Sequence, residues 1–308
     1  MHIASHYLGP GSRLVLSPKA GVRLDDSLLA CVVGGGRGCT LRIEPSMAGV
    51  WIPLRGRVQL ATADAEVDLA PRDLRVTEAG TCVQATGRGN ALWVGLIGGR
   101  AAWRNALGGV LEIPTPEPLL LPACHPADRD LRRRAIALVR AAVTAAKREP
   151  TADAMVDASV AALMDSIFRL QNRLSAAIAR CPGRTYAQRR QVFLRLQRVR
   201  NHLAVNCHLD LDNDALARMA SYSPWHFIRA FRVAYGETPH AYLVRQRLER
   251  AHRLLHGSPL AIAEVALASG FENRCAFSRL FRQRFGTTAG AVRRQAAKVP
   301  PLATAAVR

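Results

Sequence analysis

Two stretches of the sequence, 50 residues apart, carry the same arginine and aromatic residues at the same spacing. Arginine is a fixed cation with five hydrogen-bond donors, so a row of arginines on one helix face can bind phosphate groups or base edges. Residues that recur at a constant offset predict two copies of one structural unit. The matching residues are Phe227, Arg229, Phe231, Arg232, Tyr235, Gly236 and Thr238 in the first copy and Phe277, Arg279, Phe281, Arg282, Phe285, Gly286 and Thr288 in the second.

Each copy has the signals of a short helix, a tight turn and a longer helix. Ser223 and Pro224 predict a helix start, since a serine hydroxyl can accept from a free backbone N–H and proline fits the first helical position. Asn273 takes the role of Ser223 in the second copy. Gly236 and Gly286 predict the helix ends, because glycine tolerates the left-handed conformation found there. This order is the helix-turn-helix plan, with helices expected over residues 212–220, 223–235, 262–269 and 273–285.

One face of each longer helix is free to meet DNA. Phe227 and Phe231 lie four residues apart and should face the core, as should Phe277 and Phe281. Arginine can bind guanine in the major groove, and tryptophan or isoleucine can meet thymine methyl groups. A solvated face is the alternative, and the choice between base and phosphate contacts stays open. The candidate DNA-binding residues are Trp225, Ile228, Arg229, Arg232, Asn273, Arg274, Cys275, Ser278, Arg279 and Arg282.

A third helix, opened by Thr238-Pro239 and closed near Gly257, should join the two copies. Its apolar positions can pack on both, which would hold the two reading helices at a fixed separation. Successive major grooves lie about 34 to 36 Å apart. The apolar positions are Tyr242, Leu243, Leu248, Ala251, Leu254 and Leu255.

From about Val192 to Arg294 the sequence resembles the AraC/XylS family of bacterial transcription regulators. The resemblance implies seven helices, specific binding to double-stranded promoter DNA, RNA polymerase as a further partner, and an N-terminal cupin-like domain that binds a small-molecule effector or mediates dimerisation. It rests on Leu216-Ala217-Arg218-Met219-Ala220, Ser223-Pro224, Phe231-Arg232, Tyr235-Gly236-Glu237-Thr238-Pro239, Tyr242-Leu243, Arg247-Leu248-Glu249-Arg250-Ala251, Leu254-Leu255, Ile262-Ala263-Glu264-Val265-Ala266, Gly270-Phe271 and Phe277-Ser278-Arg279-Leu280-Phe281.

The second copy departs from the family pattern. Thr288 is followed by Ala289 where the family has proline, and Val292 replaces the aromatic residue before Arg293. Ala261 replaces the usual Ser or Thr cap, which costs a helix about 1 kcal/mol. The first helix of the second unit is therefore expected to fray, and the second unit is expected to hold DNA more weakly than the first.

The N-terminal half predicts a β-rich domain, which makes the fold class α+β. Short apolar runs separated by turn residues are typical of a sandwich or jelly-roll barrel, and residues 56–81 resemble the hairpin rhythm of cupin barrels. Trp51, Arg55 and Trp93 are candidates for an effector pocket, with core tryptophans and a surface arginine as the alternative. Strands are expected at 28–33, 40–43, 50–54, 57–62, 66–69, 74–77, 81–86 and 92–97.

Two long helices should follow the barrel. Five prolines between Ile113 and Pro126 favour an extended connector, after which residues 128–147 and 153–179 have helical patterns. The second helix carries a heptad stripe that predicts a homodimer, with packing on the barrel or on the preceding helix as the alternative. The stripe comprises Val156, Val160, Leu163, Ile167, Leu170, Leu174 and Ala177.

These patterns predict a cupin-like domain over residues 1–181 and a DNA-binding domain over residues 190–298. The barrel is expected at about 14–112 and the flanking helices at about 128–180, with residues 184–190 as an exposed linker.

The net charge of +20 indicates an anionic partner, although an Arg- and Ala-rich composition can also reflect base composition of the genome. The seven cysteines form no CxxC pair, and no stretch reaches the about 18 apolar residues of a membrane span, so a cytoplasmic protein without a metal is expected.

Two other functions remain alternatives to a DNA-binding regulator. A cupin-type enzyme usually needs histidine ligands, and there is no histidine between Tyr7 and Cys124. The glycine run from Gly34 to Gly38 lacks the spacing of a phosphate loop. A non-specific nucleic-acid binder explains the charge but not the repeated caps. The sequence therefore predicts a regulator without enzymatic activity or cofactor.

Overall fold

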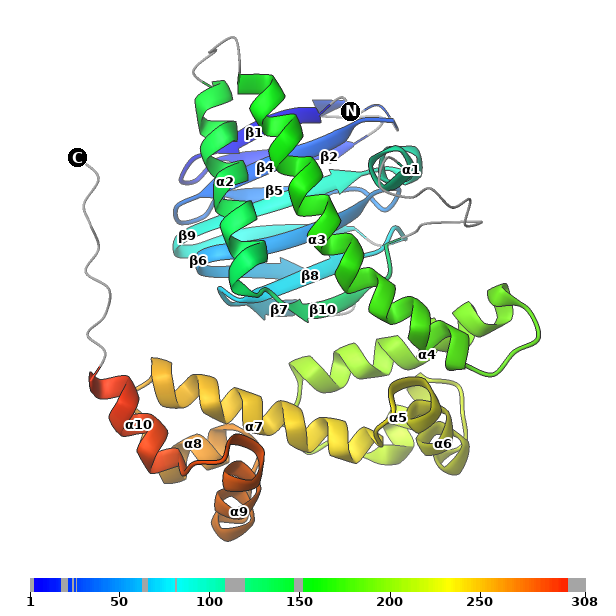
Figure 1. Cartoon of the computed structure of the whole chain (residues 1–308), viewed down its shortest axis with the longest axis vertical. Coiled ribbons are helices and arrows are strands. Elements are labelled where there is room, and N and C mark those ends of the chain that lie inside the picture. The colour runs from blue at the N-terminus through cyan, green and yellow to red at the C-terminus, as the bar shows by residue number, and fades with distance from the viewer. Residues whose placement is uncertain are drawn as a thin grey trace. The chain divides into compact units, whose positions relative to one another are not determined.

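The computed structural model describes residues 3–17, 22–23, 25, 27–62, 66–80, 82–108, 120–146 and 152–298. The chain forms two compact units, Met1–Ala176 and Ala177–Arg308, which we call the N-terminal and the C-terminal unit (Figure 1). Among the helices of these described ranges, none combines the length and the hydropathy needed to cross a bilayer.

The N-terminal unit is built on one ten-stranded sheet. Its central path runs β10-β8-β6-β9-β5-β2-β3, with β4 on β9, β1 on β4 and β7 on β6. No pairing among the described residues joins the two ends of this path, so the sheet is not closed and the expected cupin-like barrel is not confirmed. The strands are β1 Ile3–Leu8, β2 Arg13–Ser17, β3 Val22–Arg23, β4 Leu29–Gly35, β5 Thr40–Ile43, β6 Ala48–Ala61, β7 Glu66–Leu69, β8 Asp73–Thr77, β9 Val83–Gly98 and β10 Ala123–Pro126.

Strands β6 and β9 are long and pair with each other along almost their whole length. The sequence predicted two short strands in place of β6 and two in place of β9, and this prediction was wrong. The register shifts between Pro53 and Arg57, where Gly56 has a φ of 67°. A Cβ on Gly56 would lie 2.8 Å from the Cα of Ala91, so this bulge requires glycine. The turn residues in the sequence mark a bulge rather than the end of a strand.

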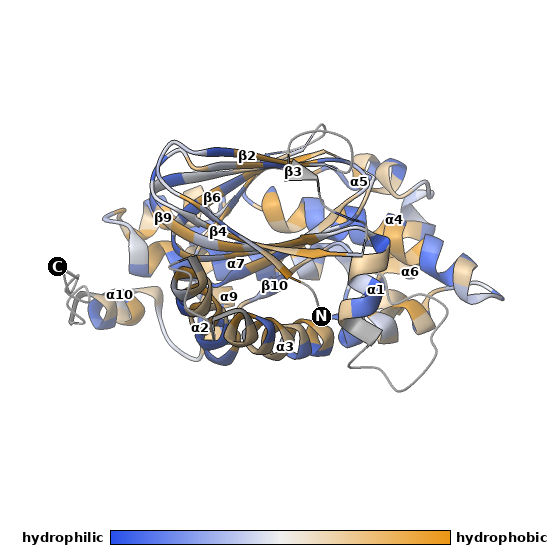
Figure 2. Cartoon of the chain, turned by 90° about the horizontal axis from the view of Figure 1, so that it is seen from above, coloured by the Kyte–Doolittle hydropathy of each residue, from blue (hydrophilic) through white to orange (hydrophobic). Residues whose placement is uncertain are grey.

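The sheet folds into two layers, with β2 and β3 in one and β4 in the other (Figure 2). Successive residues of β6 point to opposite faces, as the two-residue period of a strand requires. Trp51 belongs to the core between the layers, with Leu41 and Ile43 of β5. Val50 and Ile52 belong to a second core, on the outer face.

Helices cover that outer face. They are α1 Arg100–Gly108, which the sequence analysis did not predict, α2 Arg129–Ala146 and α3 Ala152–Arg180. Most of the heptad stripe of α3 lies in the same core as Val50. Val156, Val160, Leu163 and Ile167 are at most 2% exposed, and Leu170 packs beside them. These side chains are therefore covered within their own unit. This arrangement fits the alternative in which the stripe packs on the β-rich domain or on the preceding helix. Leu174 and Ala177 are also buried.

The connector before α2 ends in regular structure. Residues Ala123–Pro126 form β10, which pairs antiparallel with β8. Pro126 is tolerated because β10 is an edge strand and lies at the end of the path. Pro114, Pro116 and Pro118 lie outside the described residues.

The C-terminal unit contains the seven helices that the family resemblance implies. They are α4 Tyr186–Val205, α5 Asn213–Met219, α6 Pro224–Tyr235, α7 Pro239–Gly257, α8 Ile262–Ala268, α9 Arg274–Phe285 and α10 Ala289–Lys298. Residues 184–190 are not a linker, because α4 begins within them. Thr185 and Gln188 form a reciprocal capping box, with both hydrogen bonds at 3.2 Å. This Thr-x-x-Gln pattern was visible in the sequence.

We predict that Leu163→Glu destabilises the fold by about 4 kcal/mol or more, because it places a carboxylate in the core beneath the sheet. Ala158→Glu, at an exposed position of the same helix, should change stability by no more than about 0.5 kcal/mol. Calorimetry and sedimentation of both variants test this. A folded Leu163→Glu monomer obtained from a dimeric parent would instead support a dimer interface at the stripe.

Candidate nucleic-acid interface

The first helix-turn-helix consists of α5, the turn after it and α6. Asp212 caps α5 by accepting hydrogen bonds from the backbone of Asp214 and Ala215. Pro224 occupies the first turn of α6 as expected, but Ser223 makes no side-chain bond to the backbone. Its hydroxyl lies 2.7 Å from Nδ1 of His226 instead. The expected serine cap was therefore wrong, because the imidazole one turn along competes for the hydroxyl.

The second helix-turn-helix, α8 and α9, has better caps than the sequence suggested. Asn273 Oδ1 accepts from the backbone N–H groups of Cys275 and Ala276, at 2.9 and 3.0 Å. At the start of α8 the backbone of Ala261 donates to Glu264 at 2.7 Å, which supplies half of a capping box. Thr288 caps α10 without the missing proline by accepting from Ala291. The hydrogen bond to Glu264 therefore partly replaces the side-chain cap that Ala261 cannot make.

Each reading helix ends on a left-handed glycine and is anchored by two phenylalanines, as predicted. The φ of Gly236 is 79° and that of Gly286 is 69°. The four phenylalanines are fully buried, with ring centroids 5.8 Å apart on α6 and 5.4 Å apart on α9. They are Phe227, Phe231, Phe277 and Phe281.

The opposite faces of α6 and α9 are open to solvent. Trp225 is 63% exposed, and the guanidinium of Arg229 stacks over its indole, 5.4 Å from the ring centroid. Cys275 stands at the equivalent of Trp225 on α9, so Arg279 has no aromatic ring at that position. All ten candidate residues are exposed: Trp225, Ile228, Arg229, Arg232, Asn273, Arg274, Cys275, Ser278, Arg279 and Arg282.

Helix α7 ties the two helix-turn-helix elements together. Arg247 donates to the carbonyl oxygens of Cys207 and Leu209, in the turn before α5, at 2.7 and 2.9 Å. Arg250 donates to the carbonyl oxygen of Ala268, at the end of α8, at 3.0 Å. Gly270 approaches the same turn so closely that a Cβ would lie 3.0 Å from the carbonyl oxygen of Cys207. Helix α7 thus holds both the turn before α5 and the end of α8.

An ion-pair chain adds a link between the ends of the reading helices. Arg245 of α7 binds Glu237, in the turn after α6, at 2.8 Å and Glu249 at 3.3 Å. Glu249 also pairs with Arg284 of α9 at 3.5 Å. Burial alone would lower the pKa of Arg245, but its hydrogen bond to Glu237 and the two carboxylate charges outweigh burial and raise it.

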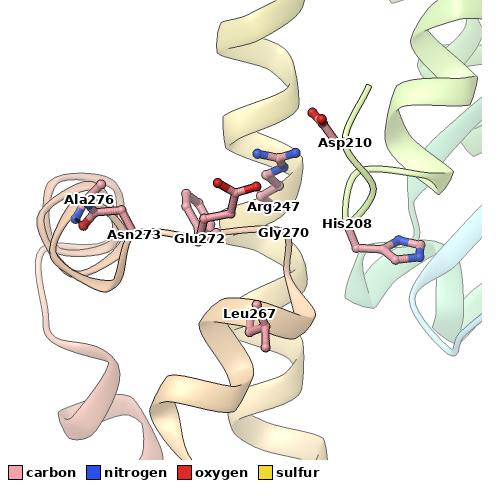
Figure 3. A pocket seen from close by; sticks show the side chains of 9 residues that line it. His208, Asp210, Arg247, Leu267, Gly270, Glu272, Asn273 and Ala276 are labelled. Carbon is pink, nitrogen blue, oxygen red and sulfur yellow. Dashed lines mark hydrogen bonds between the residues drawn. The ribbon is translucent and has the colours of Figure 1, made fainter. Parts of the chain in front are cut away.

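A pocket of about 440 Å³ lies where the two motifs meet (Figure 3). Asp210 and Glu272 place carboxylates beside it, and Leu267 and Phe271 supply apolar surface. Burial, followed by the charge of Arg250, lowers the pKa of His208, which favours its neutral form at pH 7. The two carboxylates repel phosphate and the guanidinium of Arg247 attracts it, so the pocket as a whole has no clear preference for DNA. Asn273 is the residue of its lining that belongs to the candidate DNA surface.

The three candidate effector residues lie in two different environments. Trp51 and Trp93 are each 1% exposed in the core between the sheet layers. Their indole N–H groups are satisfied by Thr77 at 3.0 Å and by the sulfur of Cys39 at 3.3 Å. Arg55 is solvent-exposed and binds Asn90. Their burial and exposure fit the alternative of core tryptophans and a surface arginine, and the effector pocket stays a prediction. Among the described residues, no three His, Cys, Asp or Glu side chains could hold a metal ion.

Comparisons with known proteins agree with this site. Residues 216–295 match a family described as a helix-turn-helix domain. The chain is 44% identical over 86 residues to the HTH-type transcriptional regulator GlxA of Rhizobium meliloti (strain 1021), covering 28% of this chain and 26% of GlxA. It is 35% identical over 105 residues to the transcriptional activator NphR of a Rhodococcus species, covering 34% and 31%. The probable transcription factor PqrA of Proteus vulgaris is 35% identical over 75 residues, covering 24% and 62%.

The similarity covers less than two thirds of each of these relatives. Among solved structures, the DNA-binding domain of AdpA in complex with a target DNA is 33% identical, with a TM-score of 0.32, covering 33% of this chain and 91% of that one.

Residues 216–295 are therefore a helix-turn-helix domain of the DNA-binding class. With its paired motifs and named relatives, this C-terminal domain belongs to the AraC/XylS family.

We predict that the two expected caps differ in their contribution to stability. Asn273→Ala should cost about 1 kcal/mol, because it removes two backbone hydrogen bonds. Ser223→Ala should cost less than about 0.5 kcal/mol, because Ser223 caps no backbone group. Calorimetry of the full chain measures both, and equal losses would contradict the assigned hydrogen bonds.

Proposed function

We propose that this chain is a sequence-specific, DNA-binding transcription regulator of the AraC/XylS type. In this proposal the helices over residues 223–235 and 273–285 read two successive major grooves. The observation that carries it is the repeated exposed face, with Arg229 and Arg279 at equivalent positions of two helices that a shared helix holds together. In the described part of the chain, neither arginine forms an ion pair.

The chemistry of this face suits duplex DNA. A guanidinium can donate two hydrogen bonds to the O6 and N7 atoms of guanine, and an exposed indole can pack on a thymine methyl group. Stacking on Trp225 limits the directions that Arg229 can take, so less freedom is lost when it binds. Arg232, Arg274 and Arg282 are suited to phosphate contacts. The names of GlxA, NphR and PqrA as transcription regulators support the same function.

The proposed partners of the whole protein extend beyond DNA. By resemblance to the family, we include RNA polymerase, a small-molecule effector and a second copy of the chain. Most of the heptad stripe is buried, so the support for self-association comes from other residues of the helices. Ile136 and Val143 are each 38% exposed and lie seven residues apart on α2, and Met155 of α3 is 52% exposed. Apolar side chains on an outer helix face are suited to a partner helix.

We predict that Arg229→Ala weakens binding to the specific site by about 1 to 3 kcal/mol. Arg279→Ala should have a smaller effect, because Arg279 lacks the tryptophan that orients Arg229. Arg140→Ala is the matched control, since this exposed arginine of α2 lies in the N-terminal unit. Binding titrations on the selected site and on scrambled DNA, at two salt concentrations, measure these effects.

The pattern of loss distinguishes the two kinds of contact. A base contact loses discrimination at one position of the site, whereas a phosphate contact weakens binding to all sequences and reduces the salt dependence by about one unit. If both variants fold and bind like the parent, α6 and α9 are not the reading helices.

A further inference from the structure

The carbonyl end of α6 is held by an arginine from outside the helix-turn-helix region. Nε and Nη2 of Arg180 both donate to the carbonyl oxygen of Ala234, at 3.1 and 2.8 Å. Arg180 is the last residue of α3, and the last turn of that helix, from Ala177, belongs to the C-terminal unit. Ala234 lies in the last turn of α6, where backbone carbonyls have no partner further along the helix.

This contact is the kind that stabilises a helix end. The carbonyl end of a helix carries partial negative charge, so a guanidinium there adds electrostatic stabilisation to its hydrogen bonds. The left-handed Gly236 satisfies the carbonyl of Arg232 through its own N–H, at 2.8 Å. Arg180 therefore complements the glycine cap, because the two bind different carbonyls of the same turn.

A second polar contact fixes the neighbouring residue. The Tyr235 hydroxyl donates to Oε1 of Gln197, a fully buried residue of α4, at 2.8 Å. The ring of Tyr235 packs on Phe231, with centroids 4.7 Å apart. The last turn of α6 is thus held on its backbone by Arg180 and on its side chain by α4.

The second reading helix has a different ending. Phe285 stands at the equivalent of Tyr235 and has no hydroxyl, and it stacks on His252 at 4.7 Å. Arg284 is the equivalent of Ala234, and in the described ranges no arginine side chain donates to its carbonyl oxygen. The two helices share their glycines and phenylalanines but not the polar contacts at their ends.

We propose that Arg180 is a positioning residue for DNA reading by α6, which rests on the function proposed above. By capping the carbonyl end of α6 it fixes the direction in which that helix presents Trp225 and Arg229. Arg180 itself does not touch DNA. The functional start of the DNA-binding domain is then near Ala177, ahead of the residue 190 expected from the sequence.

The test uses the full chain with Arg180→Ala and Arg180→Lys, and Arg184→Ala as the control. Arg184 is an exposed arginine four residues along, and its backbone N–H donates to Gln188, whereas its guanidinium makes no hydrogen bond to the residues that the structure describes. Affinity is measured on the selected DNA site and on a set with each base pair changed in turn. The half-site read by α6 is the one whose discrimination Arg229→Ala removes. Thermal unfolding of each variant is recorded alongside.

Arg180→Ala should bind the site about tenfold more weakly and lose discrimination only in the half-site read by α6. Arg180→Lys should lie between this variant and the parent, because lysine keeps the charge but not the fork of two donors. If Arg180→Ala does not fold, the discrimination measured for Arg180→Lys tests the proposal in its place. Arg184→Ala should keep the discrimination of the parent.

An equal loss in both half-sites, or no loss in either, would overturn the role of Arg180. It would leave the proposed function in place, provided that the parent discriminates the site from scrambled DNA. A parent that binds all sequences equally would overturn the proposed function itself, and the role of Arg180 with it.

Discussion

The contact between α7 and both helix-turn-helix elements is the constraint on which the C-terminal unit depends. Arg247 and Arg250 are three residues apart on one helix. Arg247 binds a carbonyl oxygen in the turn that leads into the first motif, and Arg250 binds one at the end of α8 in the second. Because a helix is rigid over this length, neither motif can turn without breaking a charge-assisted hydrogen bond. Gly270 adds a steric condition, since a side chain there would meet the turn before α5. A protein that reads two sites on one duplex needs its reading helices held in this way.

The two motifs are alike in their apolar core and different at their polar ends. Both reading helices pack two phenylalanines inward and end on a left-handed glycine. Among the described residues, α6 differs from α9 in having an indole beside its central arginine and an arginine on the carbonyl oxygen of Ala234. At the other end α9 has the better cap, because Asn273 binds two backbone N–H groups while Ser223 binds none. We infer that the repeat preserves the scaffold, and that each copy has its own contacts with the surroundings.

The sequence was enough to predict features that depend only on residues close to one another in the chain. Left-handed glycines, phenylalanines four residues apart and the proline of α6 depend on one helix turn, so their spacing was enough. Non-local features were missed or misjudged. The bulge at Gly56 looks like a turn until β6 and β9 are paired, and the heptad stripe does not show whether a sheet or a second chain covers it. The role of Arg180 could not be predicted, because its partner is a backbone carbonyl 54 residues away.

The central claim is that one chain reads two adjacent positions on duplex DNA. The most direct measurement is selection of bound sequences from a random duplex pool by the purified full chain, followed by sequencing. The account predicts a motif with two short blocks whose centres are about one helical turn, roughly 10 base pairs, apart. A single block, or recovery of the pool without any enriched sequence, would contradict it.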